Sequence, residues 1–154
     1  MKMLDKQKYY MNEALIEAKK AYIKDEVPVG AVVVYNDKII ARAHNNREAK
    51  QLIYGHAEFL AINQAAEIMN TWRLEECDVY VTMEPCPMCA GAMVQARVRH
   101  VYYGAYDLKN GVASSIINLF DLPFNHHVAS TALIGDGESE RLLKDFFKKL
   151  RNKN

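Results

Sequence analysis

The sequence is poor in cysteine and in net charge, and each scarcity excludes a class of protein. Three of the 154 residues are cysteines, an odd number that does not fit the disulfide framework of a small secreted protein. Because 20 basic residues nearly balance 19 acidic ones, there is no overall positive field of the kind that marks many nucleic-acid-binding proteins. Long apolar runs are also missing, and the N-terminus is too polar for a signal peptide. We therefore expect a cytoplasmic protein with no membrane segment.

The composition and patterning that are present indicate a single α/β domain over residues 1–154. Half of the residues are apolar and a quarter are charged, as in an ordinary soluble domain. Runs of β-branched residues alternate with segments of helical spacing, which indicates an α/β layered fold. A tight turn at 36–38 joins the first two expected strands as a hairpin, so the sheet should be mixed. The expected helices cover residues 5–24, 56–70, 88–96, 115–120 and 138–151, and the expected strands cover 31–35, about 39–40, 78–83, 99–105 and 131–134.

One histidine and two cysteines form a candidate metal site. Cys86 and Cys89 are three residues apart at the start of a predicted helix, so both thiols should project from one face of it. His56 opens an earlier predicted helix. Structural zinc usually has four protein ligands, whereas three ligands and an open position for water are typical of catalytic zinc. The set therefore predicts one catalytic Zn²⁺ per chain.

Glu58, two residues after His56, is the candidate catalytic residue. Its carboxylate could take a proton from a water at the metal and pass it to the substrate without binding the metal itself. Positions two apart on a regular helix point roughly 200° apart. His56 or Glu58 must therefore lie in an irregular first turn.

Neither motif is specific alone, but the combination is. A lone C-x-x-C could be a redox pair or two core cysteines, and a lone H-x-E is usually an exposed helix start. In the order H-x-E and then P-C-x-x-C, the two match the signature of zinc-dependent nucleobase deaminases. Cys77 lies outside this signature, and a small buried hydrophobic residue at the start of a strand is the better interpretation of it.

Basic residues gather in two places although the total charge is near zero. Such a local patch could bind phosphates, but a solvated helix face and tail explain the charge at least as well. The first group is Lys144, Lys148, Lys149, Arg151 and Lys153, and the second is Arg97, Arg99 and His100.

The chain resembles the bacterial tRNA-specific adenosine deaminases (TadA), within the cytidine and deoxycytidylate deaminase superfamily. The similarity is strongest over residues 27–34 (VPVGAVVV) and 84–93 (EPCPMCAGAM). The second stretch holds the cysteines of the deaminase signature, which is itself described partly from this family. Shorter matches at 44–45, 72–74, 107–111, 125–126 and 146–151 extend the likeness over nearly the whole chain.

This resemblance implies a cytidine-deaminase-like three-layer fold, in which a central mixed sheet is flanked by helices. It implies that His56, Cys86 and Cys89 hold zinc and that Glu58 moves protons. The implied reaction is hydrolytic deamination of adenosine to inosine at the wobble position of a tRNA anticodon. A homodimer is implied as well.

The resemblance also implies RNA contacts that the residues alone would not suggest. Asn45 matches the residue that holds the target nucleoside, although by itself it would be interpreted as a turn residue. Asp107, Lys109 and Asn125 match positions near the bound anticodon loop and would otherwise be ordinary polar loop residues. Phe147 and Arg151 match C-terminal contacts to the RNA and would otherwise be a core aromatic and a helix end.

One stretch departs from the family, and two other functions stay open on the residues. Residues 52–55 are Leu-Ile-Tyr-Gly where the family usually has Asp-Pro-Thr-Ala, which affects local RNA contacts and leaves the metal set intact. A deaminase of a free base or nucleotide, such as guanine or cytosine, would carry the same zinc motif. A non-catalytic zinc protein that binds RNA would need neither Glu58 nor an open metal position.

Overall fold

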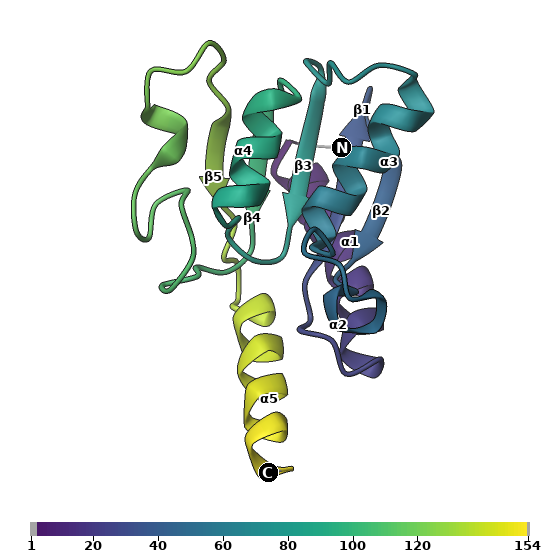
Figure 1. The fold of residues 1–154 in the computed structure, drawn as a ribbon, viewed down its shortest axis with the longest axis vertical. Helices are drawn as coiled ribbons and strands as arrows, with labels where there is room; N and C mark the ends of the chain where they lie inside the picture. The colour runs from purple at the N-terminus through teal and green to yellow at the C-terminus, as the bar shows by residue number, and fades with distance from the viewer. Residues whose placement is uncertain (1–2, 154) are drawn as a thin grey trace.

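The computed structural model describes residues 3–153, and its centre is a five-stranded mixed β-sheet (Figure 1). The strand order is β2-β1-β3-β4-β5. β1 pairs antiparallel with β2 and with β3, whereas β3, β4 and β5 run parallel to one another. The predicted α/β fold with a mixed sheet is therefore confirmed. The strands are β1 (Gly30–Tyr35), β2 (Lys38–His44), β3 (Cys77–Val81), β4 (His100–Tyr103) and β5 (Ala129–Ala132).

Helices cover both faces of the sheet and complete the three layers (Figure 1). α1 packs on one face, and α3 and α4 lie side by side on the other. α5 follows β5 and lies beyond one end of the strands (yellow in Figure 1), where Phe146 packs against Tyr22 of α1. Within residues 3–153, no helix has both the length and the apolar character needed to cross a membrane. The helices are α1 (Met3–Ile23), α2 (Arg47–Lys50), α3 (Ala57–Met69), α4 (Pro87–Gln95) and α5 (Glu138–Asn152), with a short 3₁₀ turn η1 (Leu119–Asp121).

β1 shows why both faces of the sheet are buried. Successive side chains of a strand point to opposite faces, and all four residues over 31–34 are apolar. Ala31 and Val33 join the core beneath α3 and α4, whereas the two valines that alternate with them join the core beneath α1. At Gly30 the strand meets α1 so closely that a Cβ would lie 2.1 Å from the carbonyl oxygen of Ala14. Only glycine fits there without moving α1.

Most observed elements lie within two residues of the expected bounds, but the segment before β5 differs. Residues 115–120, expected to be a helix, form turns and the short η1. Backbone N–H groups of residues 113–115 donate to the carboxylate of Glu84 at 2.8–2.9 Å. The N–H of Leu119, which an α-helix would pair with residue 115, donates instead to the carbonyl of Val112 at 2.8 Å. The segment between β2 and α3, for which no helix is expected, contains one short helix, α2.

Candidate active site

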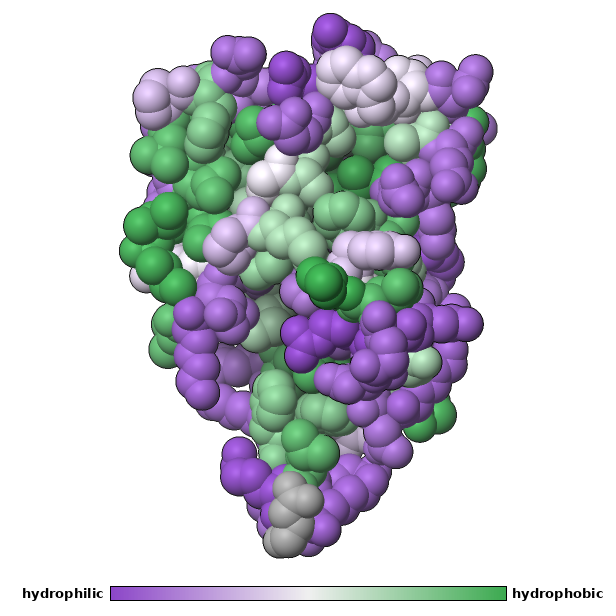
Figure 2. All heavy atoms as spheres, viewed as in Figure 1, coloured by the Kyte–Doolittle hydropathy of each residue, from purple (hydrophilic) through white to green (hydrophobic). Residues whose placement is uncertain are grey.

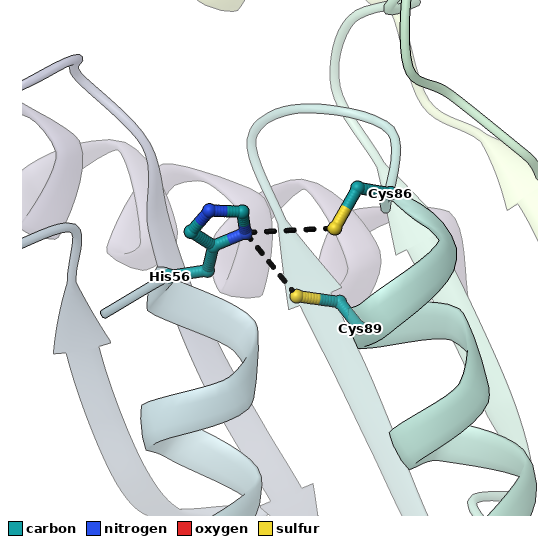
Figure 3. A group of neighbouring side chains, drawn as sticks. All are labelled: His56, Cys86 and Cys89. Carbon is teal, nitrogen blue, oxygen red and sulfur yellow. Dashed lines mark hydrogen bonds between the residues drawn. The ribbon is translucent and has the colours of Figure 1, made fainter. Parts of the chain in front are cut away.

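The three predicted metal ligands meet where two helices begin (Figure 3). His56 and Cys86 are the residues immediately before α3 and α4, and each has an extended backbone, with φ and ψ of −89° and 142° for His56 and −80° and 173° for Cys86. Cys89 is in the first turn of α4. The Nδ1 atom of His56 lies 3.6 Å from Sγ of Cys86 and 3.5 Å from Sγ of Cys89. Together the three side chains form a group that could hold a metal ion.

The spacing and chemistry of these donors fit zinc. With Zn–S bonds of about 2.3 Å, a Zn–N bond of about 2.0–2.1 Å and tetrahedral angles, the nitrogen and each sulfur should be about 3.6 Å apart. The observed separations of 3.6 and 3.5 Å match that value. A hydrogen bond from Cys89 is the main cause that lowers the pKa of the Cys86 thiol far below its usual range, and the same bond together with burial raises the pKa of Cys89. The lowered pKa of Cys86 favours its thiolate form, which is the form that binds metals.

Glu58 lies beside this group in the first turn of α3, with 4% of its surface exposed. Because His56 precedes the helix with an extended backbone, the two side chains can face one cavity despite their spacing of two. Burial raises the pKa of Glu58 to about 7, against the opposing effects of a backbone hydrogen bond and of His56. A carboxyl group with such a pKa can accept and release a proton near neutral pH, as a general acid and base must.

A cavity of about 1000 Å³ opens at the metal group and brings most of the predicted site residues together. Its floor includes His56, Glu58 and Cys86, and Cys89 is fully buried behind them. Asn125 is not among the lining residues and lies exposed in the segment that leads to β5. The predicted residues that line the cavity walls are Asn45, Asp107, Lys109, Phe147 and Arg151.

The first wall is formed by Asn45 and Arg47, which follow β2. The side chain of Asn45 is 9% exposed and is held from both ends. Its Nδ2 donates to the carbonyl of Val27 at 3.2 Å, and its Oδ1 accepts the N–H of Arg47 at 3.1 Å. Asn45 therefore shapes a turn and also faces the cavity.

Glu26 fixes the segment that follows Asn45. This carboxylate is 2% exposed and accepts the N–H groups of Glu48 at 3.0 Å and Ala49 at 2.6 Å. These donors belong to the first turn of α2, where Asn46 occupies the N-cap position without a side-chain hydrogen bond. A carboxylate from a distant part of the chain therefore caps α2.

The second wall is the segment 106–110, and Glu84 holds it in place. This carboxylate is 3% exposed and accepts the N–H of Asp107 at 3.1 Å, the N–H groups of residues 113–115 and the hydroxyl of Ser115. Burial acts to raise the pKa of Glu84, but the hydrogen bonds from Ser115 and its neighbours outweigh it and lower the pKa. Asp107 in turn accepts the N–H groups of the two residues after Leu108, at 3.2 and 3.1 Å.

The third wall is one face of α5. Phe147 is 38% exposed and faces the cavity, whereas its neighbour Phe146 is the buried aromatic. The interpretation of Phe147 as a core aromatic is therefore wrong. Lys144, Lys148 and Arg151 line the same wall. Lys144 forms an ion pair within α5, but no carboxylate among residues 3–153 pairs with Lys148 or Arg151.

Two features singled out in the sequence lie apart from this site. The mid-chain basic residues Arg97, Arg99 and His100 do not line the cavity, and Arg99 is neutralised by a two-pronged pair with Asp78 at 2.9 Å. Cys77 is fully buried and is not part of the metal group, in agreement with its interpretation as a small core residue.

Sequence reasoning missed Glu26 and Glu84, and also Arg47 and Leu108, which line the cavity. Each of the two glutamates is an acidic residue set against an apolar stretch, in EVPVG and in TMEPCP. That juxtaposition is the one signal that could have marked them, because a buried carboxylate must find hydrogen-bond donors. No local pattern marks Arg47 or Leu108.

The chain is similar to known deaminases over nearly its whole length. Residues 4–151 match the MafB19-like deaminase family. The tRNA-specific adenosine deaminase of Bacillus subtilis (strain 168) is 50% identical over 145 residues, which cover 94% of this chain and 90% of that protein. A structure from a study of A-to-I editing by tRNA:A34 deaminases at the wobble position is 40% identical, with a TM-score of 0.84 over 88% of this chain and 99% of that one. A guanine deaminase from Nitrosomonas europaea, 21% identical with a TM-score of 0.76 over 89% and 82% of the chains, shares the fold.

Proposed function

The chain belongs to the family of tRNA-specific adenosine deaminases, and from that premise we propose that its site converts adenosine to inosine at the wobble position of a tRNA anticodon by zinc-dependent hydrolysis. The observation that carries this proposal is the continuity of one cavity from the metal group and Glu58 to the face of α5. A free base would fill only part of a space of about 1000 Å³. The unpaired cations Lys148 and Arg151 at its far end suit a polyanion.

The residues of the chain divide the chemistry among them. Zinc held by His56, Cys86 and Cys89 would lower the pKa of a bound water molecule to about 7. Glu58 takes a proton from the attacking water, whose oxygen bonds to C6 of adenine. The same carboxyl group gives this proton to a ring nitrogen, takes the second proton from the hydroxyl group now bonded to C6 and passes it to the departing amino group. The C6–N bond breaks, ammonia leaves and inosine remains.

The walls of the cavity are proposed to bind the RNA around the reacting base. A base in an anticodon loop must leave its stack to enter the site, and Asn45 is the polar group we assign to the nucleoside. Asp107 and Lys109 offer polar contacts from the second wall. Phe147 offers an exposed ring on which an unpaired base can stack, a contact that contributes about 1–3 kcal/mol in single-strand binding proteins. Asn125 lies outside the cavity and is proposed as a contact for more distant nucleotides.

A free-base deaminase is the second candidate function. The structural likeness to a guanine deaminase at 21% identity concerns the fold alone, so the fold does not separate the two activities. The cation-lined face of α5 favours RNA, because a free purine has no phosphate for these residues to bind. A zinc protein without catalysis would have no need of a buried carboxyl group beside the open side of the metal site.

A direct comparison of substrates tests the proposal. The purified zinc protein is incubated with an anticodon stem-loop RNA carrying adenosine at the wobble position, with the same RNA carrying guanosine there, and with free adenosine and free guanine. We expect inosine in the adenosine stem-loop and little ammonia from the other three. Rapid turnover of free guanine without inosine in the RNA would contradict the proposed substrate and leave the deaminase chemistry standing.

We also propose that a second copy of the chain covers the outer face of α3 and α4. An apolar groove lies there, and apolar side chains run across this face in Figure 2. Ile68 of α3 is 63% exposed, although the outer face of a solvated helix is normally polar, and Trp72, which follows α3 and lines the groove, is 55% exposed. A two-fold axis that passes through the groove would bury the same patch on both copies. The groove is lined by Phe59, Ile62, Ala66, Trp72, Met88 and Ala92, among others.

Light scattering coupled to size-exclusion chromatography tests this dimer. The wild-type protein should elute with twice the mass of one chain, and Ala92→Arg, which places a charge in the groove, should shift it toward the monomer. An exposed charge change on α1, Lys8→Glu, is the control and should leave the mass unchanged. A wild-type monomer at micromolar concentration would contradict the proposal.

We propose the cytoplasm as the location of this activity and residues 1–154 as one deaminase domain. The proposed zinc site depends on two thiolates, which a reducing compartment preserves. Fractionation of cells that produce the protein, with zinc content measured in each fraction, tests the location.

A further inference from the structure

Glu84 has an unusual set of partners for a buried carboxylate. Its two oxygens accept five hydrogen bonds, all from the segment 107–115, and four of the five donors are backbone N–H groups. Among residues 3–153 it forms no ion pair with a basic side chain. A buried charge satisfied by one loop alone fixes the position of that loop, because each donor that moves away leaves part of the charge unpaired.

The position of Glu84 joins this loop to the metal group. The residue lies two positions before Cys86, between the end of β3 and the start of α4. The loop is tied to the same turn a second time, since the N–H of Val112 donates to the carbonyl of Pro85 at 3.0 Å. At Gly111 the carboxylate lies so close that a Cβ would be 2.4 Å from its Cδ atom. Backbone and carboxylate are therefore packed together without room for a side chain.

We propose that Glu84 is a positioning residue that sets the second wall of the cavity, residues 106–110, relative to the metal group, and so determines how the RNA around the reacting base is held. The inference rests on the proposed function, because it assigns this wall to RNA. Glu84 is at the edge of the cavity but outside the metal group, and its carboxylate oxygens are occupied by the donors of the loop. It acts through the backbone of Asp107 and of the turns that follow.

The substitution Glu84→Gln isolates this role. Glutamine has nearly the same shape but replaces one acceptor oxygen with an NH₂ donor. That donor would face N–H groups that now lie 2.8–3.1 Å from the carboxylate oxygens. The NH₂ group and the backbone N–H groups would repel each other, so the second wall should shift while Cys86 and the other metal ligands stay in place.

The matched control is Glu17→Gln. Glu17 is also a buried carboxylate, 3% exposed, with several hydrogen bonds. Its partners are Lys20 of α1 and Arg42 and His44 of β2, and none of them lines the cavity. It therefore reports the general effect of neutralising a buried carboxylate, without movement of the second wall.

Three measurements on the zinc-loaded proteins decide the matter. For Glu84→Gln we expect unchanged zinc content, a KM for the anticodon stem-loop raised roughly tenfold with a smaller change in kcat, and faster deuterium uptake confined to residues 106–116. For Glu17→Gln we expect neither the change in KM nor the local uptake. An unchanged KM and unchanged uptake in Glu84→Gln overturn the proposal, as does an equal rise in KM for both variants.

The outcomes remain decisive if the main variant fails or if the substrate is wrong. Should Glu84→Gln not fold, Ser115→Ala removes a single donor to the same carboxylate, and a raised KM supports the role whereas an unchanged KM with unchanged uptake overturns it. A wild-type protein that forms no inosine in any RNA contradicts the proposed function and this inference together. Normal wild-type activity with an unaltered Glu84→Gln variant contradicts the inference alone.

Discussion

Two cations of α5 that line the cavity predict a measurable dependence of RNA binding on salt. Lys148 and Arg151 line the cavity and have no carboxylate partner among the described residues 3–153. If each contacts one phosphate, the double variant Lys148→Ala/Arg151→Ala removes two phosphate contacts. Both side chains are exposed, so the stability of the fold should change by less than about 0.5 kcal/mol for each substitution.

The magnitude follows from counterion release. Each phosphate contact contributes about 0.7 to 0.9 to the slope of log K against log salt concentration, depending on strandedness. Removing two contacts should therefore make the slope shallower by about 1.4 to 1.8. Between 50 and 200 mM salt, the wild-type protein should then lose roughly 7 to 12 times more affinity than the variant.

Fluorescence anisotropy of a labelled anticodon stem-loop measures this slope directly. The control is Lys8→Ala/Lys38→Ala, which removes the same charge from exposed positions that do not line the cavity. Its slope should stay close to that of the wild type. Equal slopes for the α5 variant and the control would refute the assignment of α5 to RNA.

Four further predictions follow from the core and the site. Glu58→Gln should lower kcat by about 10²–10⁴ and leave zinc bound; near-normal kcat would show that Glu58 is not the proton carrier. Cys86→Ala should abolish stoichiometric zinc in metal analysis and lower the melting temperature, because metal binding is coupled to folding; retained zinc would contradict the ligand set. Leu74 is fully buried, so Leu74→Ala should lower the free energy of unfolding measured in urea by about 2–5 kcal/mol; a decrease below about 1 kcal/mol would contradict its packing. Burial raises the pKa of Glu17, but hydrogen bonds from basic neighbours outweigh it and lower the pKa. The stability it contributes is therefore present above its unfolded pKa of about 4.3 and is lost as pH falls through the folded value; urea midpoints of Glu17→Gln should depend less on pH between 5 and 3, and equal dependence would contradict this.

The metal group and the core could be predicted from the sequence because each depends on local pattern. His56, Cys86 and Cys89 occur in motifs whose residue types and spacing fix their chemistry, and the spacing of Glu58 from His56 already required an irregular helix start. The structure places His56 outside α3, as that constraint demanded. The continuous apolar run at the start of β1 similarly indicates a buried strand.

The cavity walls could not be predicted, because they depend on contacts between distant segments. Residues 115–120 have helical spacing, but their neighbours donate N–H groups to Glu84, about 30 residues earlier. The capping of α2 by Glu26 is likewise a contact across more than 20 residues. Phe146 and Phe147 are adjacent and chemically identical, and the direction of α5 alone decides which one is buried.

Direct detection of inosine at the wobble position tests the central claim. Bulk tRNA lacking inosine is incubated with the zinc-loaded protein and then reverse-transcribed, so that inosine is read as guanosine at the edited site. We predict conversion at the wobble adenosine of the anticodon with the wild-type protein and none with Glu58→Gln. Wobble adenosines that stay unchanged under conditions in which the protein holds one zinc per chain would contradict the claim.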